Sequence, residues 1–273
     1  MRVSPKVAVV ILVACFLGGA ARAATPEGLA VAQLAVVERL VEQASDADKW
    51  HKAKEGTALR IGERLRTPAD GVAGIEFAWM TATLGPSTVM SFPDAFLLAT
   101  QLEQGRVELK SEGRDILKLQ TPEAEVRGRG RVVVRRQGGA TLVMAFGGRF
   151  LVEGAGKTVT LAQGKGTIVR PGKAPIPPVS LGAAPGDLWP GADPVYVGQG
   201  EAVAFNWKSA EHAHQVAVLP VGSDLVLMQR DIGAPPWKME IPWTGAFRWR
   251  VSTRDERGLE GMPSEGLICV VDK

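Results

Sequence analysis

The sequence predicts an all-β protein of two domains. Short runs in which apolar and polar residues alternate recur along most of the chain, and this is the period of a half-buried strand. Turn residues separate the runs, since the 273 residues include 32 glycines and 18 prolines. A proline-rich stretch divides the chain into a longer first part and a shorter second part. The hydrophobic content of 45% is enough for a substantial core.

The first 23 residues have the layout of a secretory signal peptide. Arg2 and Lys6 supply a short positive region, and an unbroken apolar run follows from Val7 to Leu17. Ala21-Arg22-Ala23 then places small residues at a cleavage site. The apolar run is shorter than the roughly 18 residues that a membrane-spanning helix needs. We therefore expect a cleaved signal peptide at residues 1–23 and a mature chain in the periplasm without a transmembrane helix.

A lipoprotein signal is the alternative interpretation of the same segment. Leu12-Val13-Ala14-Cys15 fits the four-residue lipobox, which would make Cys15 the lipidated first residue of the mature protein. Phe16-Leu17 continues the apolar run past this cysteine, which favours ordinary cleavage before residue 24. Cys269 is then the one cysteine that remains, and its apolar neighbours predict a small buried residue in a terminal strand.

Loss of the signal peptide removes the apparent basic charge of the chain. The segment carries three of the 32 basic residues and no acidic residue, so 29 basic and 29 acidic residues remain. A net charge near zero argues against general binding to nucleic acid.

The first domain is predicted over residues 32–170. Alternation at Ile75 to Trp79 and at Arg106 to Lys110 indicates strands with one buried face. Further strands are expected at 116–119, at 141–146 ending at Gly147-Gly148, at 150–152 and at 159–161. The stretch from Leu29 to Gln43 also fits a helix, but a strand over 33–41 is preferred because more β pattern follows directly.

A linker and a second β-domain are predicted to follow. Residues 171–194 contain seven prolines, which favours an extended linker over 171–200. Strands expected at 203–207, 215–219, 225–229, 247–251 and 267–271 then make a small β-sandwich the simplest arrangement for 201–273. Trp207, Trp243 and Trp249 would fill its core, while Trp237 beside Pro235-Pro236 could lie on a loop.

A series of short motifs carries a family resemblance in the first domain. They are Trp50 and Gly56, LRIGERLRT at 59–67, IEF at 75–77, LEQGRV at 102–107, LQTPEAEV at 119–126 and VTLAQGKG at 159–166. In this order and spacing the domain resembles the periplasmic FecR domain, which implies a twisted, solenoid-like β-domain. The family usually has a Gly-Thr pair after its Thr-Pro step, where this chain has Gly128-Arg129-Gly130-Arg131.

The second domain resembles an immunoglobulin- or fibronectin-type-III-like sandwich. Phe205-Asn206-Trp207 is similar to an early strand of such domains, and the stretch from Gly245 to Ser252 is similar to a late one. Asp255 with the Gly258-Leu259-Glu260-Gly261 turn and Ser264 is similar to the loop that follows. This resemblance implies a fold and no particular partner.

The strongest candidate binding site is a run of arginines in the first domain. Its members are Arg127, Arg129, Arg131, Arg135 and Arg136. In a regular strand the odd-numbered arginines share one face, and guanidinium groups bind phosphates and carboxylates with two hydrogen bonds. The partner would be an envelope protein or an anionic component of the cell wall or lipid. The alternative is that the run guards a sheet edge against pairing.

Catalytic and cofactor motifs are not found in the sequence. It contains three histidines and no nucleophile elbow, phosphate-binding loop or His-Glu-x-x-His motif. His212 and His214 could lie on one strand face, but two imidazoles do not complete a metal site. We expect neither enzyme activity nor a cofactor or metal. A cell-wall hydrolase or its carbohydrate-binding module is a weaker class, because no paired carboxylates stand out.

The sequence therefore predicts a non-enzymatic, exported FecR-domain protein that binds proteins or envelope surfaces as a scaffold or adaptor. In FecR itself the domain relays the state of an iron-siderophore transporter to a sigma factor. That relay needs an anti-sigma segment and a transmembrane helix, and neither is recognised in this sequence. An accessory role in iron-siderophore signalling is the alternative function.

Overall fold

The structure is a computed structural model that describes residues 30–45, 49–94, 99–111, 113 and 115–272. The predicted signal peptide, with the alternative lipidation site at Cys15, lies outside the described residues. All regular secondary structure in the described ranges is β-strand, so the all-β prediction is confirmed. Within those ranges no helix has the length and apolar character needed to cross a membrane.

Fifteen strands form one continuous open sheet in the first domain. They are β1 (Ala30–Glu38), β2 (Val41–Ala44), β3 (His51–Ala53), β4 (Ala58–Arg60), β5 (Arg64–Arg66), β6 (Val72–Phe77), β7 (Met80–Leu84), β8 (Val89–Asp94), β9 (Ala99–Ser111), β10 (Leu117–Gln120), β11 (Glu125–Gln137), β12 (Ala140–Gly154), β13 (Lys157–Ala162), β14 (Lys165–Val169) and β15 (Val179–Ser180). The main path runs β15-β14-β12-β11-β10-β9-β7-β6-β1-β4, and nearly all neighbours are antiparallel.

One face of this sheet surrounds a single hydrophobic core. Leu34 on β1, Leu65 on β5 and Phe150 on β12 belong to the same buried cluster and are fully inaccessible to solvent. Strands at opposite ends of the sheet path therefore share one core, because the twisted sheet brings their apolar faces together. Because successive side chains of a strand point to opposite faces, every second residue faces away from this core.

The second domain is a sandwich of two smaller sheets. Its strands are β16 (Gly186–Trp189), β17 (Val195–Gly198), β18 (Ala202–Lys208), β19 (Ala213–Pro220), β20 (Met228–Ile232), β21 (Trp237–Glu240), β22 (Gly245–Arg254) and β23 (Ser264–Val271). The sheets are β16-β18-β21 and β17-β23-β22-β19-β20. Trp207 and Trp249 are buried between them, and Trp243 packs against their cluster, as the sequence predicts.

The predicted linker is shorter in the structure than residues 171–200. β15 pairs with β14 of the first domain, while β16 and β17 are strands of the sandwich. The prolines of this stretch do not prevent these strands, because every proline lies between strands and none lies within β15, β16 or β17. Trp237 likewise lies on a strand, with its ring against Phe205.

Two local predictions are corrected by the strand pairing. Residues 30–38 form one strand and 41–44 another, separated at Arg39, whose φ is positive. Cys269 lies on the terminal strand β23 as expected, but it is half-buried, because Ile268 and Val270 take the core-facing positions beside it. Its thiol is free.

The Gly147-Gly148 pair does not end a strand. β12 continues through it as one strand of 15 residues that pairs with β11 along its whole length. Phe146 is the extra residue of a β-bulge, since Arg131 pairs with Gly147 while Val132 pairs with Ala145. Gly148 has a φ of 80°, and a Cβ there would lie within 3.0 Å of the carbonyl of Arg129.

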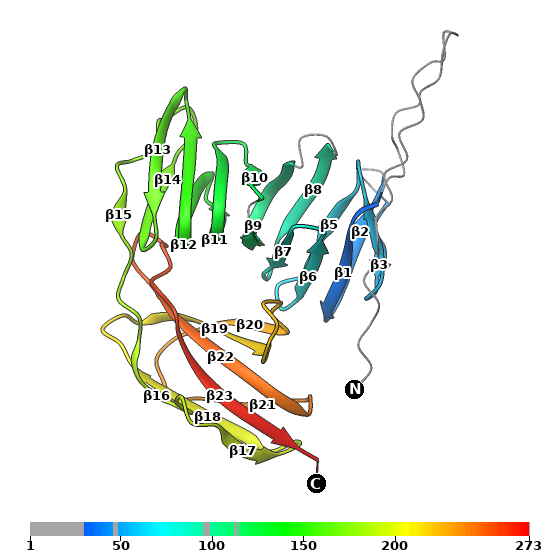
Figure 1. Ribbon diagram of the computed structural model, residues 1–273, viewed down its shortest axis with the longest axis vertical. Coiled ribbons are helices and arrows are strands. Elements are labelled where there is room, and N and C mark those ends of the chain that lie inside the picture. The colour runs from blue at the N-terminus through cyan, green and yellow to red at the C-terminus, as the bar shows by residue number, and fades with distance from the viewer. Residues whose placement is uncertain (1–29, 46–48, 95–98, 112, 114, 273) are drawn as a thin grey trace.

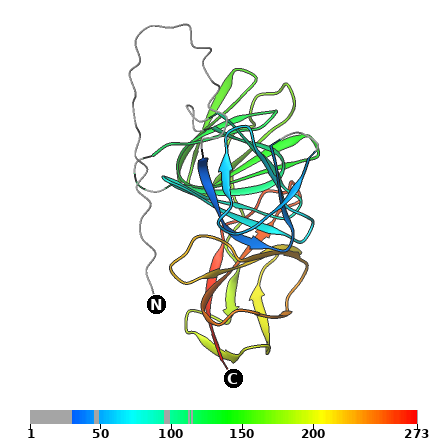
Figure 2. The same ribbon diagram turned by 90° about the vertical axis from the view of Figure 1, so that its right-hand side faces the viewer.

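The two domains pack sheet against sheet. In Figure 1 the strands from β6 to β12 lie in a row above β19, β20 and β22, and Figure 2 shows the same stacking from the side. Val216, Val218 and Trp249 point into the sandwich core. Alternation therefore turns Ala217 and Arg250 toward the first domain. Strands β19, β20 and β22 are therefore covered on both faces.

Replacing Gly148 by alanine is expected to destabilise the fold. The Gly148→Ala change forces a positive φ on a residue with a Cβ and drives that Cβ into β11, which together cost about 3 kcal/mol of unfolding free energy. Gly156→Ala is the matched control, because Gly156 has a φ of 71° but nothing within 4 Å of the new Cβ. It should cost only about 1 kcal/mol. Urea denaturation measures both, and equal losses would contradict the close-approach argument.

Candidate functional site

The arginine run lies on β11, which is an interior strand of the sheet. β12 pairs with it on one side, and β10 and then β9 pair with it on the other. The edge-guarding interpretation is therefore wrong. Val132 and Val134 point into the core of the first domain, so the odd-numbered arginines share the opposite face, as predicted.

Three of the five arginines are held in ion pairs. Arg131 donates from Nε to Glu108 Oε1 at 2.7 Å. Arg136 donates from Nε to both carboxylate oxygens of Glu123 and from Nη2 to Oε1, the last at 2.8 Å. Arg135 lies 3.7 Å from Asp231, which belongs to the second domain. These side chains hold the protein together, and they are not free to bind a partner.

Arg106 is the centre of a buried contact between the domains. It projects from β9, and its Nε and Nη2 atoms donate to the two carboxylate oxygens of Glu260 at 2.8 and 2.9 Å. Its Nη1 atom donates to Gln229 Oε1 at 3.1 Å. Arg106 is 5% exposed and Glu260 is fully buried. A guanidinium buried this deeply is stable only with such partners, because desolvation of an unpaired charge costs several kcal/mol.

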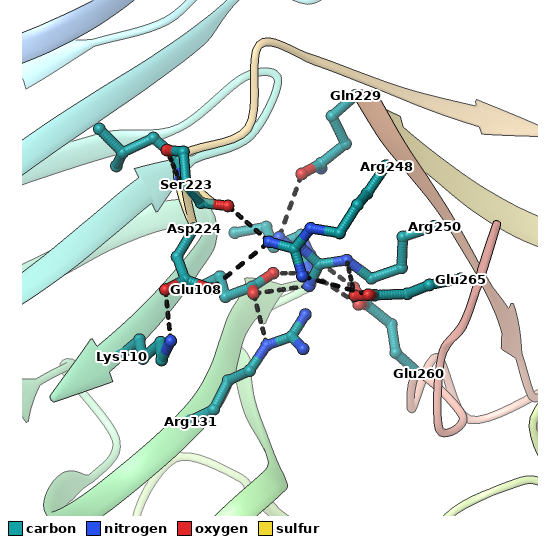
Figure 3. Close-up of polar contacts among 12 residues, drawn as sticks. Glu108, Lys110, Arg131, Ser223, Asp224, Gln229, Arg248, Arg250, Glu260 and Glu265 are labelled. Atoms are coloured by element: carbon teal, nitrogen blue, oxygen red, sulfur yellow. Dashed lines mark hydrogen bonds and ion pairs between the residues drawn. The ribbon is translucent and has the colours of Figure 1, made fainter. Parts of the chain in front are cut away.

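Glu108 makes the reciprocal contact from the same strand. Its Oε1 atom accepts from Arg131 and, at 2.8 Å, from Arg250 of the second domain (Figure 3). Its Oε2 atom accepts from Arg106 at 3.3 Å. Burial alone would raise the pKa of Glu108, but the guanidinium groups of Arg131 and Arg106 outweigh it and hold the pKa below its ordinary value. The ionised carboxylate is therefore the stable form.

These side chains are called the interdomain charge network below. Its members are Arg106, Glu108, Arg131, Gln229, Arg250 and Glu260. A cavity of only about 10 Å³ remains beside it, which is at the limit for one water molecule. Apolar clusters seal the network on two sides: one joins Val72 to Leu219 and Val226, and the other joins Met144 to Leu259.

Further ion pairs surround the network at the domain boundary. Arg230 of the second domain donates to Glu38 of the first at 2.8 Å. Lys110 on β9 pairs with Asp224, and Arg248 contacts both Asp224 and Glu265 (Figure 3). These outer pairs are more exposed than the central ones, so each contributes less to stability.

The remaining arginines of β11 are exposed beyond the edge of the interface. Arg127 and Arg129 have no ion pair or side-chain hydrogen bond with any described residue. Arg149 on β12 is exposed and equally unpaired within the described part, and it lies directly opposite Arg129 in the ladder. Arg127, Arg129 and Arg149 are called the arginine patch. The sequence run omits Arg149, because only the register of β11 and β12 brings it there.

A shallow groove lies at the arginine patch. It has a volume of about 600 Å³, and its walls are the three arginines with Ile116 and Leu151. Ile116 is 55% exposed and Leu151 is half-buried. The groove therefore combines positive charge with exposed apolar surface.

The histidine pair predicted as an incomplete metal site is separated in the structure. His212 precedes β19 and is exposed. His214 is 1% exposed, its ring packs against Trp207, and its Nδ1 atom lies 2.7 Å from the carbonyl oxygen of Gly233. Among the described residues no group of three or more His, Cys, Asp or Glu side chains could hold a metal ion.

Comparison with known proteins finds solved structures that are similar to part of this chain. No protein-family model matches the chain, and no curated protein matches it. A crystal structure of a candidate anti-sigma factor from Parabacteroides distasonis has 17% identity and a TM-score of 0.38, over 43% of this chain and 59% of that one. A second structure from the same organism, also described as an anti-sigma factor, has a TM-score of 0.37. The chain thus spans 59% of the length of these neighbours.

The fibronectin(III)-like modules of Clostridium thermocellum CbhA are also similar. The identity is 13% and the TM-score 0.25, over 63% of this chain and 89% of that one. The resemblance to the FecR family stays a prediction from the sequence.

Removing the charge of Glu108 is expected to destabilise the packing of the two domains. Glu108→Gln keeps the shape of the side chain but leaves the buried guanidinium groups of Arg106 and Arg250, and the half-buried one of Arg131, without their shared anion. The expected cost is about 3 kcal/mol in unfolding free energy. Glu153→Gln is the control, since Glu153 is exposed and unpaired among the described residues. It should change stability by less than about 0.5 kcal/mol. Urea denaturation measures both, and similar values for the two variants would contradict a stabilising role for the network.

Stability is also expected to fall in acid. Burial would raise the pKa values of Glu108, Asp231 and Glu123, but their arginine partners lower them, so the unfolded chain binds more protons than the folded one below about pH 4.5. Their contribution is present above that pH and is lost as the pH falls through the folded-state values. Glu38 changes stability with pH in the opposite direction. Burial raises its pKa, so the folded chain holds this proton more tightly than the unfolded chain does.

Urea denaturation at a series of pH values tests this dependence. The unfolding free energy of the wild type should decrease between about pH 5 and pH 3, and Glu108→Gln should flatten the decrease. A Glu108→Gln slope equal to that of the wild type would show that Glu108 does not titrate with folding.

Proposed function

We propose that this chain is a non-enzymatic, exported FecR-domain protein that acts as a rigid two-domain adaptor in the cell envelope. The interdomain charge network carries the proposal. It joins the two domains through buried, hydrogen-bonded pairs, so the domains present their surfaces in one relative orientation. A fixed orientation is what an adaptor needs in order to position partners, whereas domains joined by a small polar contact move independently.

The partner surface of the adaptor is the arginine patch. Its guanidinium groups are exposed and unpaired among the described residues, while the other arginines of β11 are held in ion pairs. Exposed guanidinium groups favour partners with phosphate or carboxylate groups. The signal peptide predicted at residues 1–23 supports a periplasmic location, where such groups belong to the envelope.

The state of the arginine-paired carboxylates supports a binding role in preference to catalysis. A general acid or base works best with a pKa near the working pH. The pKa values of Glu108, Glu123 and Asp231 are instead lowered, because paired arginines outweigh the effect of burial. These carboxylates are held ionised in structural contacts.

Affinity capture from envelope extracts tests the proposal. The full exported chain is compared with a variant in which Arg127, Arg129 and Arg149 are all changed to alanine. Arg131 is kept, because its loss would disturb the interdomain charge network. We expect the wild type to retain a set of envelope components that the patch variant loses.

A second triple variant controls for the loss of charge. Lys52, Lys54 and Arg60 are exposed and make no side-chain ion pair among the described residues. Lys52 lies on β3, Lys54 directly follows β3 and Arg60 ends β4, all far along the sheet from β11. Changing them to alanine removes the same charge and should leave the captured set unchanged. Identical captured sets for the wild type and the patch variant would refute the assigned surface, and recovery of the protein in the cytoplasm alone would refute the exported role.

A further inference from the structure

We infer that the arginine patch binds an anionic phospholipid, with the phosphate between the guanidinium groups and the acyl chains over Ile116 and Leu151. This inference rests on the proposed function, since it assigns a ligand to the same surface. The ligand is argued from three features of the patch: its paired positive charges, its exposed apolar side chains and its size.

The charge of the patch requires an anion. Arg129 and Arg149 are directly opposite each other on neighbouring antiparallel strands, and like charges in that position destabilise a sheet. Glu125, the nearest acidic residue along β11, is paired with Lys118 at 3.3 Å, and Glu153, two residues beyond Leu151 on β12, makes no ion pair with a described residue. A phosphate group placed between the two guanidinium groups would accept hydrogen bonds from both and remove their repulsion.

The apolar part of the groove requires more than an anion. Ile116 is one of the large hydrophobic side chains that the described fold leaves exposed, and Leu151 lies beside Arg127 in the ladder. Gly128 and Gly148 line the same groove and add no side chain to it. An inorganic phosphate would leave this apolar surface in water, whereas acyl chains would cover it and gain free energy in proportion to the area buried.

The size of the groove favours one small amphiphile over a macromolecule. Its volume of about 600 Å³ lies within the range of small-ligand sites. The second domain covers the adjoining part of the same sheet face, where Met144 and Phe146 pack near Leu259. A stable protein interface needs about 800 Å² on each partner, and nucleic-acid binding to single strands relies on aromatic stacking, for which the residues lining the groove offer no aromatic ring.

Vesicle cosedimentation with the full exported chain tests the inference. Vesicles of phosphatidylglycerol are compared with vesicles of phosphatidylcholine, in which the headgroup is neutral overall. We expect binding to phosphatidylglycerol alone, weakened by salt. The variant with Arg127, Arg129 and Arg149 changed to alanine should bind on the order of 100-fold more weakly, since each basic residue at an anionic surface contributes roughly five-fold. The variant of Lys52, Lys54 and Arg60 should bind like the wild type.

A second comparison separates the lipid from its headgroup. A short-chain, soluble phosphatidylglycerol should bind at least about 10-fold more tightly than glycerol phosphate, because only the former covers the apolar residues. Changing Ile116 and Leu151 to serine should remove this difference and leave the affinity for glycerol phosphate unchanged. Thermal unfolding confirms that each variant is folded, and all these residues lie outside the interdomain charge network.

Several results would overturn the inference. Equal binding to both vesicle types, or an equal loss in the control variant, would remove the patch from lipid recognition. Glycerol phosphate that binds as tightly as the short-chain lipid would make the site a simple anion site. Polyglutamate that binds the patch more tightly than phosphatidylglycerol would point to an acidic protein. In that last case patch-dependent capture from envelope extracts would persist, so the proposed function would stand while the lipid would be rejected.

Discussion

Two buried ion pairs across the domain boundary are the constraint on which the architecture depends. Arg106 pairs with Glu260, and Glu108 pairs with Arg250. Arg106 and Glu108 both project from β9 toward the second domain, and both lose their contact with water when the domains meet. Glu260 and Arg250 compensate each charge with one of opposite sign. Two hydrogen bonds to one carboxylate fix direction as well as distance, so the sandwich is stable on this sheet in one orientation. Buried ion pairs are weak sources of stability but define geometry well when fully paired.

The same constraint decides which arginines of β11 are available for binding. The bulge at Phe146 and the close approach at Gly148 lie at the boundary. On one side Arg131 faces Glu108 beneath the second domain, and on the other Arg129 faces solvent beside Arg149. One strand thus serves the domain interface with one half and the exposed surface with the other. Arg129 and Arg131 are similar in sequence and differ in role because the second domain covers only part of their strand.

Much of the fold could be predicted from the sequence, and the site only in part. Alternation at Ile75 to Phe77 reports local burial, so it identifies β6 correctly, but the strand ends at Phe77 and Trp79 lies in the bend before β7. The run of arginines also predicts their shared face. Burial by a second domain leaves no local signal, however, because Arg106 and Glu108 occupy polar positions that look solvated. Arg149 joins the patch through the register of β11 and β12, and Gly147-Gly148 was expected to end a strand because glycine pairs also form turns. Each of these features depends on contacts between segments that are far apart in the sequence.

The position of strands β19, β20 and β22 determines whether the second domain can be separated from the first. One face of strands β19, β20 and β22 packs on the sandwich core, and the other face packs on the first domain. These strands are therefore the middle one of three layers. The second domain therefore carries a face adapted to a single neighbour, the first domain. Transferred alone, it would expose Leu219 beside Arg250 and Gln229, an apolar and charged surface suited to aggregation. The sandwich therefore needs the first domain to keep this face out of water.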